Sequence, residues 1–405
     1  MQFSTLMADQ IMKKFTIILS VLIVTSLNTN AQWVEPSAVA WNSQNVYALL
    51  TDGSNIYAGT GSAGVSLSGN NGNSWTAVNN GLTSTGISSF AKIGSNIFAA
   101  GWGVFVTSNN GGLWAPVFNG LTDTTVNALA VSGTNIFAGT NGGVFLSANN
   151  GALWTAANNG FTGQIHALAV IDTNIFAGAP NNGVYLSGNN GGLWTSVKNG
   201  LTNIDVRALA TSGKNIFAGT SGGVFLSSNN GALWTAVNSG LTNLNIYALF
   251  VNGTTIFAGT DSGVFYSKNM GTNWYAFNQG FPPITAVQAF TISGTYIFAG
   301  IRLHPRGVWR RPFSEATSVI ENNNTSSSFN VYPNPATDII SLNFETINSS
   351  DLKFNIYSIT GNLVKSEILK LNERQINIGD LSNGVYVVEI KTTEWTKQQK
   401  IIIQR

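Results

Sequence analysis

The sequence predicts an all-β fold: a seven-bladed β-propeller followed by a small C-terminal immunoglobulin-like β-sandwich. Of the 405 residues, 44 are glycine and 11 are tryptophan, while only 9% are charged, which is typical of many short strands joined by tight turns. A phrase of about 40 residues recurs along the chain, as in the blades of a propeller. After residue 313 the repeat stops and the composition changes.

Each repeat unit contains four predicted strands, which we call a to d. In the third unit we expect them over residues 126–131, 135–140, 144–147 and 153–157. Near-continuous apolar character in strands a and b indicates burial on both faces, and the absence of helical periodicity excludes a helical solenoid. The first strands of the seven units begin at Val46, Ile87, Val126, Ile165, Val206, Ile246 and Val287.

The seventh unit lacks its own strand d. The repeat ends after residues 307–311, whereas the pattern of a strand d occurs around Trp33. Trp33 precedes the first strand a by 13 residues, and Trp274 precedes the last strand a by the same number. We expect residues 32–35 to pair with the strand around residues 308–310, because this would close the ring and remove an open sheet edge.

The N-terminal segment has the pattern of an export signal. Two lysines precede an apolar run over residues 15–27, which is too short to span a bilayer and is followed by a small-residue cleavage site near Ala31. We interpret residues 1–31 as a signal peptide whose true start is Met12, and residues 32–313 as the propeller. The mature chain is then expected to have no transmembrane segment.

The C-terminal part has a different pattern from the repeats. Residues 314–328 are polar and aperiodic, as expected of a linker. Residues 329–405 contain alternating strands and turn signals, which favour a small antiparallel sandwich.

Four short stretches of this C-terminal part point to a family. They are Val331–Asp338, Asn355–Tyr357 with Gly361, Leu381–Tyr386 and Lys400–Ile403. In this order they resemble the C-terminal sorting domain of the type IX secretion system of Bacteroidetes. The resemblance implies export through the periplasm, contact with the secretion machinery through residues 329–405, and release or anchoring at the outer surface.

A turn of the form S-x-N-x-G-x-x-W recurs between strands c and d. It resembles the Asp-box, or BNR repeat, of propellers such as bacterial sialidases and the photosystem II assembly-factor family. Asparagine stands where that motif has aspartate, and its carbonyl oxygen can accept the same hydrogen bonds. The resemblance implies a structural turn with a packed tryptophan, on the face away from the ligand site. The residues are Ser68, Asn70, Gly72 and Trp75, then Asn109 and Trp114, Asn149 and Trp154, Asn189 and Trp194, Asn229 and Trp234, and Asn269 and Trp274.

The acidic residues argue against a sialidase-like enzyme. Hydrolysis of a glycosidic bond usually needs two carboxylates flanking that bond, and the seven units contain no glutamate. Asp205 and Asp261, in neighbouring units, remain as a candidate catalytic pair. The chain has two histidines and no cysteine, so we expect no metal site, no cofactor and no disulfide. A net charge of +2 does not indicate the broad positively charged surface that binds nucleic acid.

The positions that vary between repeats indicate where a ligand would bind. The second residue of strand a is polar in all seven units, and we expect this ring, together with the b–c loops, to surround the channel mouth. Polar and aromatic side chains there suit a glycan, although a solvated mouth without a ligand explains them too. The arginines at 302, 306, 310 and 311 are interpreted either as an anion site or as solvated charge in a degenerate closing unit. The ligand-binding candidates are Tyr47, Asn127, His166, Arg207, Tyr247, Gln288, Trp102, Arg302 and Arg306; Ser88 completes the ring.

The sequence therefore predicts a secreted or cell-surface, monomeric propeller that acts as a non-catalytic binding module for a glycan or a surface protein. The alternative is a glycoside hydrolase that uses Asp205 and Asp261 on the channel-mouth face.

Overall fold

The computed structural model describes residues 32–35, 44–283, 285–302, 306–317, 330–343, 352–359, 362–370, 375–391 and 396–405. The chain divides into two compact units, residues 1–317 and 318–405. The export signal expected over residues 1–31 lies outside the described residues. In the part of the chain that the structure describes, no helix has the length and hydrophobicity needed to cross a membrane.

The first unit is built from antiparallel sheets, six with four strands and one with three among its described residues. Two sheets are β1 (Val46–Asp52), β2 (Asn55–Thr60), β3 (Val65–Ser68), β4 (Thr76–Ala77), and β5 (Ile87–Ile93), β6 (Asn96–Gly101), β7 (Gly103–Thr107), β8 (Ala115–Pro116). Two more are β9 (Val126–Ser132), β10 (Asn135–Thr140), β11 (Gly143–Ser147), β12 (Thr155–Ala156), and β13 (Ala167–Ile171), β14 (Asn174–Ala179), β15 (Gly183–Ser187), β16 (Thr195–Ser196). Then follow β17 (Val206–Ser212), β18 (Asn215–Thr220), β19 (Gly223–Ser227), β20 (Thr235–Ala236), and β21 (Ile246–Asn252), β22 (Thr255–Thr260), β23 (Gly263–Ser267), β24 (Tyr275–Ala276). The last sheet is β25 (Ala286–Ser293), β26 (Tyr296–Arg302) and β27 (Gly307–Pro312).

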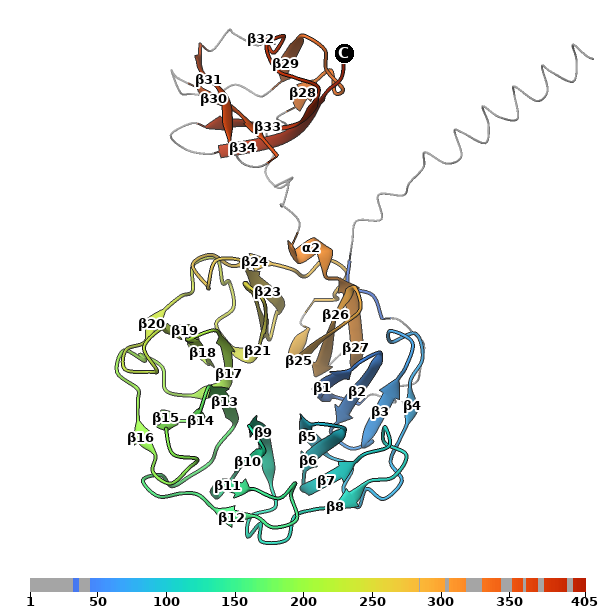
Figure 1. The fold of residues 1–405 in the computed structure, drawn as a ribbon, viewed down its shortest axis with the longest axis vertical. Coiled ribbons are helices and arrows are strands. Elements are labelled where there is room, and N and C mark those ends of the chain that lie inside the picture. Colours follow the sequence, from blue (N-terminus) through green and yellow to red (C-terminus); the bar gives the residue numbers. More distant parts are fainter. Residues whose placement is uncertain are drawn as a thin grey trace, which may run out of the picture. The chain divides into compact units, whose positions relative to one another are not determined.

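These sheets surround a central opening, with the first strand of each sheet innermost (Figure 1). Strands pair in chain order within every sheet, and β1 contacts β25, so the ring is continuous. Neighbouring sheets pack closely: a Cβ on Gly139 of β10 would lie 2.5 Å from Cγ2 of Ile165 in the next sheet. Glycine at this position therefore lets two sheets approach face to face. The predicted all-β propeller is confirmed.

In the third sheet the strands follow the predicted pattern with one difference. β10 has the expected bounds, and β9 and β11 are each one residue longer than expected. Strand d is shorter: β12 contains only Thr155 and Ala156 instead of residues 153–157. The reason is that the amide of Leu153 donates to Oδ1 of Asn149, so Leu153 belongs to the preceding turn.

The turns between the third and fourth strands, which we call the box turns, have one hydrogen-bond pattern in six sheets. In the third sheet the Ser147 hydroxyl donates to Oδ1 of Asn149, and the Gly151 amide donates to the Ser147 oxygen over 2.9 Å. The hydroxyl–asparagine distance is 2.8 to 3.0 Å in all six copies. The residue before the glycine has positive φ, which asparagine tolerates better than most residues, as at Asn150 (φ 56°).

The box-turn tryptophans join neighbouring sheets. Trp154 is 1% exposed, its indole Nε1 donates to the Val117 carbonyl of the preceding sheet over 2.7 Å, and its amide donates to Asn119. The same indole bond, also 2.7 Å long, is made by Trp114, Trp194, Trp234 and Trp274. Each of these five tryptophans thus satisfies its buried N–H while joining the rim of one sheet to the next.

Trp33 performs this role where the ring closes. Its indole donates to the Phe277 carbonyl over 2.5 Å and its amide to Gln279 over 2.7 Å. Val34 and Arg310 form an antiparallel bridge, with backbone bonds of 3.0 and 2.9 Å. The prediction that residues 32–35 pair with the last strand, β27, is confirmed.

The segment after β27 differs from the expected linker. The short helix α2 (Ser314–Thr317) lies within residues 314–328 and packs on the first unit. Ala316 is fully buried in the same apolar cluster as Trp33, and Glu315 forms an ion pair with Arg311 (2.7 Å). Buried apolar area thus extends the first unit to residue 317, whereas a polar sequence pattern alone suggested an end at 313.

The second unit contains two antiparallel sheets. One is β28 (Asn330–Tyr332), β29 (Ile339–Asn343) and β32 (Gln375–Asn377); the other is β31 (Leu363–Leu369), β30 (Leu352–Ser358), β33 (Gly384–Lys391) and β34 (Thr396–Ile403). Their apolar side chains form one core cluster, as in a small sandwich. Two of the predicted motifs meet: Ala336 forms a parallel bridge with Ile403, and Asp338 pairs with Arg405 (2.9 Å).

Candidate functional site

The variable ring position is a β-bulge in the innermost strands. In β1, for example, Val46 pairs with Thr60 and Ala48 with Gly59, which leaves Tyr47 as an extra residue. The pairing register shifts at the same position in five further sheets. In the fourth sheet two consecutive residues face one partner: the His166 amide donates to the Gly178 carbonyl, and Ala167 pairs with Gly178. A bulge changes the direction of one side chain without changing the rest of the strand. The backbone therefore gives all seven sheets one position whose side chain can vary.

Two ring residues link neighbouring sheets. The Ser88 hydroxyl donates to the Val126 carbonyl over 2.5 Å. Asn127 donates through Nδ2 to the Ile165 carbonyl and to Oδ1 of Asn141, both over 3.0 Å. These two side chains stabilise the ring as well as facing its mouth.

Two adjoining cavities meet at Trp102, between the first three sheets. The larger, of about 570 Å³, is lined by Thr83, Ser84, Thr85, Phe118 and Thr124, and the smaller, of about 220 Å³, by Tyr47, Ser88, Thr125 and Asn127. Both are also lined by Gly61, Gly86 and Trp102, and no charged side chain is among the described residues that line either one. The structure thus brings together three of the predicted candidates, Tyr47, Asn127 and Trp102.

Trp102 is an exposed aromatic side chain on a fixed backbone. It occupies the tip of the hairpin between β6 and β7 and is 74% exposed. A backbone bridge joins it to Thr125 of the next sheet, and the Gly103 amide donates to the Thr124 carbonyl over 2.7 Å. A Cβ on Gly101 would lie 1.7 Å from the Gly86 carbonyl oxygen, so only glycine permits this close approach.

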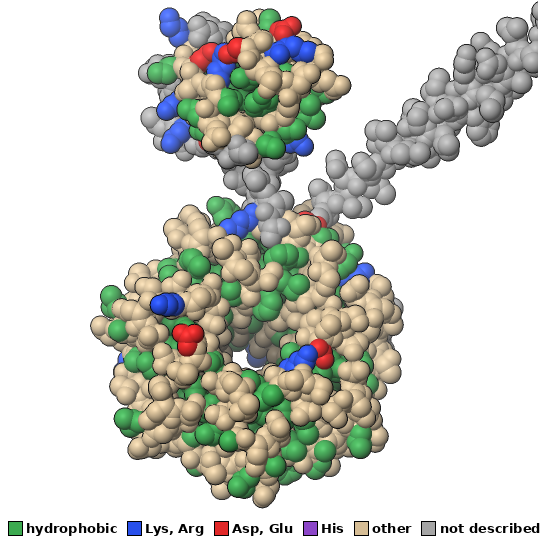
Figure 2. Space-filling model, viewed as in Figure 1, with side chains coloured by type: hydrophobic (Ala, Val, Ile, Leu, Met, Phe, Trp, Pro, Cys, Tyr) green, Lys and Arg blue, Asp and Glu red, His purple; other side chains and the backbone are tan. Residues whose placement is uncertain are grey.

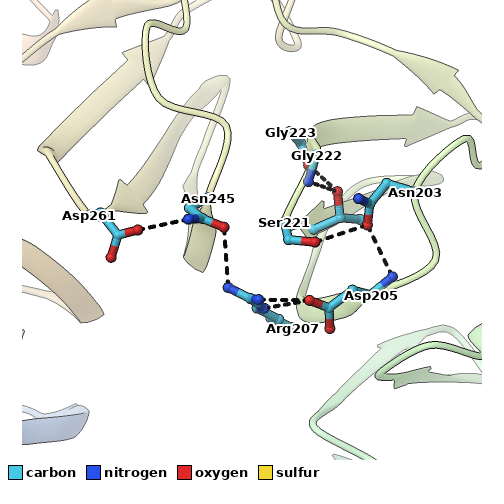
Figure 3. A network of polar contacts seen from close by, with 9 residues as sticks. Asn203, Asp205, Arg207, Ser221, Gly222, Gly223, Asn245 and Asp261 are labelled. Atoms are coloured by element: carbon cyan, nitrogen blue, oxygen red, sulfur yellow. Dashed lines mark hydrogen bonds and ion pairs between the residues drawn. The ribbon is translucent and has the colours of Figure 1, made fainter.

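A network of charged and polar side chains joins the fifth and sixth sheets (Figure 3). Asp205 accepts from Nε and Nη2 of Arg207 over 3.0 and 2.7 Å, and Nη1 of Arg207 lies 3.4 Å from Oδ1 of Asn245. Asn245 in turn donates to Oδ2 of Asp261 over 2.8 Å. The two aspartates predicted as a candidate pair therefore belong to one network, with an arginine and an asparagine between them.

Tyr247 lies between two guanidinium groups. The Cζ atoms of Arg207 and Arg302 are 5.1 and 5.0 Å from the centre of its ring. His166 lies near the same network: desolvation lowers its pKa, with the Asp205 carboxylate opposing this effect and the Arg207 guanidinium adding to it. The imidazole is therefore kept neutral over a wider pH range than usual.

The predicted cluster of four arginines does not form. Arg310 stacks over Tyr296 at 4.7 Å and donates to the backbone carbonyl of Asn71, in a box turn. Arg311 stacks over Phe277 and pairs with Glu315. Arg310 and Arg311 pair with Phe298 and Ile297 near the start of β26, whereas Arg302 is the last residue of that strand, so neither accompanies Arg302. Arg306 immediately precedes β27.

The sequence prediction missed Asn245 and the loops that precede the first strands. The amide of Asn245 donates to Oδ1 of Asn243, that of Asp205 to Asn203, and that of Thr125 to Asp123. Asp123 thus closes a turn in the way that asparagine does elsewhere. The T-D or T-N pair before the first strands of the third, fifth and sixth sheets was the available signal for this turn.

The propeller is poor in charge outside these contacts. In the face seen in Figure 2, charged side chains are sparse around a hollow at the centre of the ring. The candidate site therefore has two parts, which we call the neutral arc (Tyr47, Ser88, Trp102 and Asn127, with the loop threonines) and the charged arc (Asp205, Arg207, Asn245, Tyr247, Asp261 and Arg302).

Comparison with known proteins identifies the second unit and the fold of the first. Residues 330–404 match the family described as the secretion system C-terminal sorting domain. YCF48 from Cyanidioschyzon merolae is 14% identical, with 70% of this chain and 99% of that chain covered and a TM-score of 0.54. A structure of YCF48 bound to D1 peptide is also 14% identical, with coverages of 67% and 93% and the same TM-score. At this identity the likeness shows the fold alone.

One curated enzyme shares a shorter stretch. The endo-acting ulvan lyase of Formosa agariphila is 34% identical over 99 residues, which are 24% of this chain. The match spans 19% of the length of that enzyme. The chain therefore carries a type IX secretion system C-terminal sorting domain behind an all-β propeller, and that domain directs it to the cell surface or the extracellular space.

Proposed function

We propose that the propeller is a non-catalytic module that binds a glycan at the neutral arc, outside the cell. The observation that carries the proposal is Trp102, a largely exposed indole fixed beside two cavities that are lined by hydroxyl and amide groups. Sugars present hydroxyl groups at their edges and weakly apolar C–H surfaces on their faces. An aromatic ring beside hydrogen-bonding side chains matches both.

The absence of charge at the described lining residues favours a neutral ligand at this arc. Its hydrogen-bonding groups are threonine and serine hydroxyls, the Asn127 amide and the Tyr47 hydroxyl, which already accepts from Nδ2 of Asn45 over 3.1 Å. Because the Trp102 hairpin is bonded to the next sheet, little conformational entropy is lost when a ligand stacks on it.

The alternative, a glycoside hydrolase that uses Asp205 and Asp261, has some support because both carboxylates lie in one network on the mouth side. The relative from Formosa agariphila is by name an endo-acting ulvan lyase, and a lyase cleaves by elimination and not by hydrolysis. In addition, Asp205 is engaged by Arg207, and neither aspartate lines the two cavities at Trp102. These contacts favour binding over hydrolysis.

The test is a glycan array probed with residues 32–405, followed by titration of the best ligand. We expect Trp102→Ala to weaken binding at least about tenfold, since stacking on an aromatic ring contributes on the order of 1.5 kcal/mol. Tyr275→Ala is the matched control, because Tyr275 is a 42% exposed aromatic on the outer strand β24. Unchanged binding in Trp102→Ala would contradict the proposed site, and polysaccharide cleavage that disappears in Asp205→Asn would contradict the non-catalytic role. Binding to a surface protein but to no glycan would contradict the ligand class.

A further inference from the structure

We propose that Arg302 and Gln288 form a second subsite at the charged arc, which binds an anionic group, a carboxylate or a sulfate, on the ligand. The inference deepens the proposed function, because it gives the glycan an acidic substituent. It depends on different residues from the neutral arc and can be tested separately.

Arg302 has a free hydrogen-bond donor. It is the last residue of β26, and its guanidinium lies over the Tyr247 ring, which holds it by a cation–π contact. Its Nε atom is buried and has no hydrogen-bond partner among the described residues. A buried donor without a partner is costly, and an acceptor on a ligand would remove that cost.

The other arginine at Tyr247 is already neutralised. Arg207 is bound by Asp205 through two contacts of 3.0 and 2.7 Å. Asp261, the second carboxylate of this arc, accepts from the neutral Asn245 amide. Within the described residues neither carboxylate lies within ion-pair distance of Arg302, so its charge is available to an anion from outside.

Gln288 supplies a second donor from the same sheet. It occupies the bulge of β25, and its Nε2 atom is likewise buried without a partner among the described residues. Arg302 pairs with Ala286, two residues before Gln288, so both donors lie at the mouth end of the last sheet. A guanidinium and an amide at one end of a sheet suit a group that carries two or three oxygen acceptors.

The test compares ligands that share one backbone and differ only in charge. Oligogalacturonate and its methyl ester test the carboxylate, and a sulfated galactan oligosaccharide with its desulfated form tests the sulfate. We expect the wild-type protein to prefer one acidic form, and Arg302→Gln to weaken that binding about 10- to 100-fold while changing binding of the neutral form less than about twofold. The preference should also shrink as the salt concentration rises.

Arg310→Gln is the matched control, because Arg310 is also stacked on a tyrosine but away from the mouth. Gln288→Glu is a second variant that places a carboxylate beside Arg302, and we expect it to abolish the acidic preference without loss of thermal stability. Equal binding of acidic and neutral forms by the wild type, or an acidic preference that survives both Arg302→Gln and Gln288→Glu, would overturn the inference. Acidic binding that needs Arg302 but not Trp102 would support this subsite and overturn the neutral-arc proposal instead.

Discussion

The box turns and the mouth ring, which is formed by the bulge residues of the innermost strands from Tyr47 to Gln288, belong to the same repeat. The residues of the box turns recur from copy to copy, whereas those of the mouth ring differ. In the box turns the side chains are part of the structure: the serine, asparagine and tryptophan make the same bonds in copy after copy. In the mouth ring the recurring feature is the backbone bulge, and the side chain on it changes from Tyr47 to Arg207 to Gln288. The bonds in the box turns restrict which side chains can stand there, whereas a bulge is formed by the backbone and accepts side chains of different kinds.

The largest expected effect is a difference in the free energy of unfolding between a tryptophan variant in a box turn and one at the mouth. Trp154 is buried and bonded to the neighbouring sheet, so Trp154→Ala should lower the free energy of unfolding by about 3–5 kcal/mol. Trp102 is exposed at the mouth, so Trp102→Ala should change it by less than about 0.5 kcal/mol. Denaturant unfolding of the two variants checks this. Similar losses in both would show that the mouth hairpin also holds the fold.

The prediction of intermediate size compares two kinds of hydrogen-bond acceptor. In the sorting domain the acceptor is the Glu389 carboxylate, whereas in the box turns it is the neutral side-chain amide of asparagine. Burial alone would raise the pKa of Glu389, but hydrogen bonds from Asn355, Gln398 and Tyr357 outweigh it and hold the pKa below its ordinary value. A depressed folded-state pKa stabilises the domain above the unfolded pKa, and this stabilisation is lost as the pH falls through the folded value.

We therefore expect hydrogen exchange in residues 384–391 to accelerate below about pH 4.5 in the full chain, relative to its intrinsic rate. Glu389→Gln should lessen this acceleration. The box turns contain no carboxylate and no histidine, so their amides serve as the internal control at acidic pH. Acceleration of equal size in both places would show that the pH effect does not arise from Glu389.

The smallest expected effect sharpens the account of the box turns. Oδ1 of Asn149 accepts from the Ser147 hydroxyl and the Leu153 amide, and an aspartate oxygen would accept both bonds equally well. Asn149→Asp should therefore change the free energy of unfolding by less than about 0.5 kcal/mol at neutral pH. Asn149→Ala, which removes the acceptor, should cost about 1–3 kcal/mol. If Asn149→Asp were as harmful as the alanine change, the amide nitrogen would have to take part in the turn.

Much of the fold could be predicted from the sequence, and less of the site. The bounds of β10 and the pairing of Val34 with Arg310 follow from a repeat that places equivalent residues at equivalent positions. The grouping of Arg302 with Arg310 and Arg311 was wrong because Arg302 ends β26, whereas Arg310 and Arg311 pair with residues at the start of that strand. The bulges were not predicted either, since one extra residue leaves no distinctive sequence pattern.

The sequence by itself determined the repeat length, the strands, the box turns and the sorting domain, because these depend on apolar patterning and on hydrogen bonds between residues close in the chain. Only the tertiary structure decided which side chains of different sheets meet at the mouth. Arg302 reaches Tyr247, and Trp102 shares a cavity with Tyr47, only after the ring has closed and each bulge has turned its side chain. The physical reason is that such contacts depend on how neighbouring sheets pack, and that packing is set by buried residues such as Gly139 and Ile165.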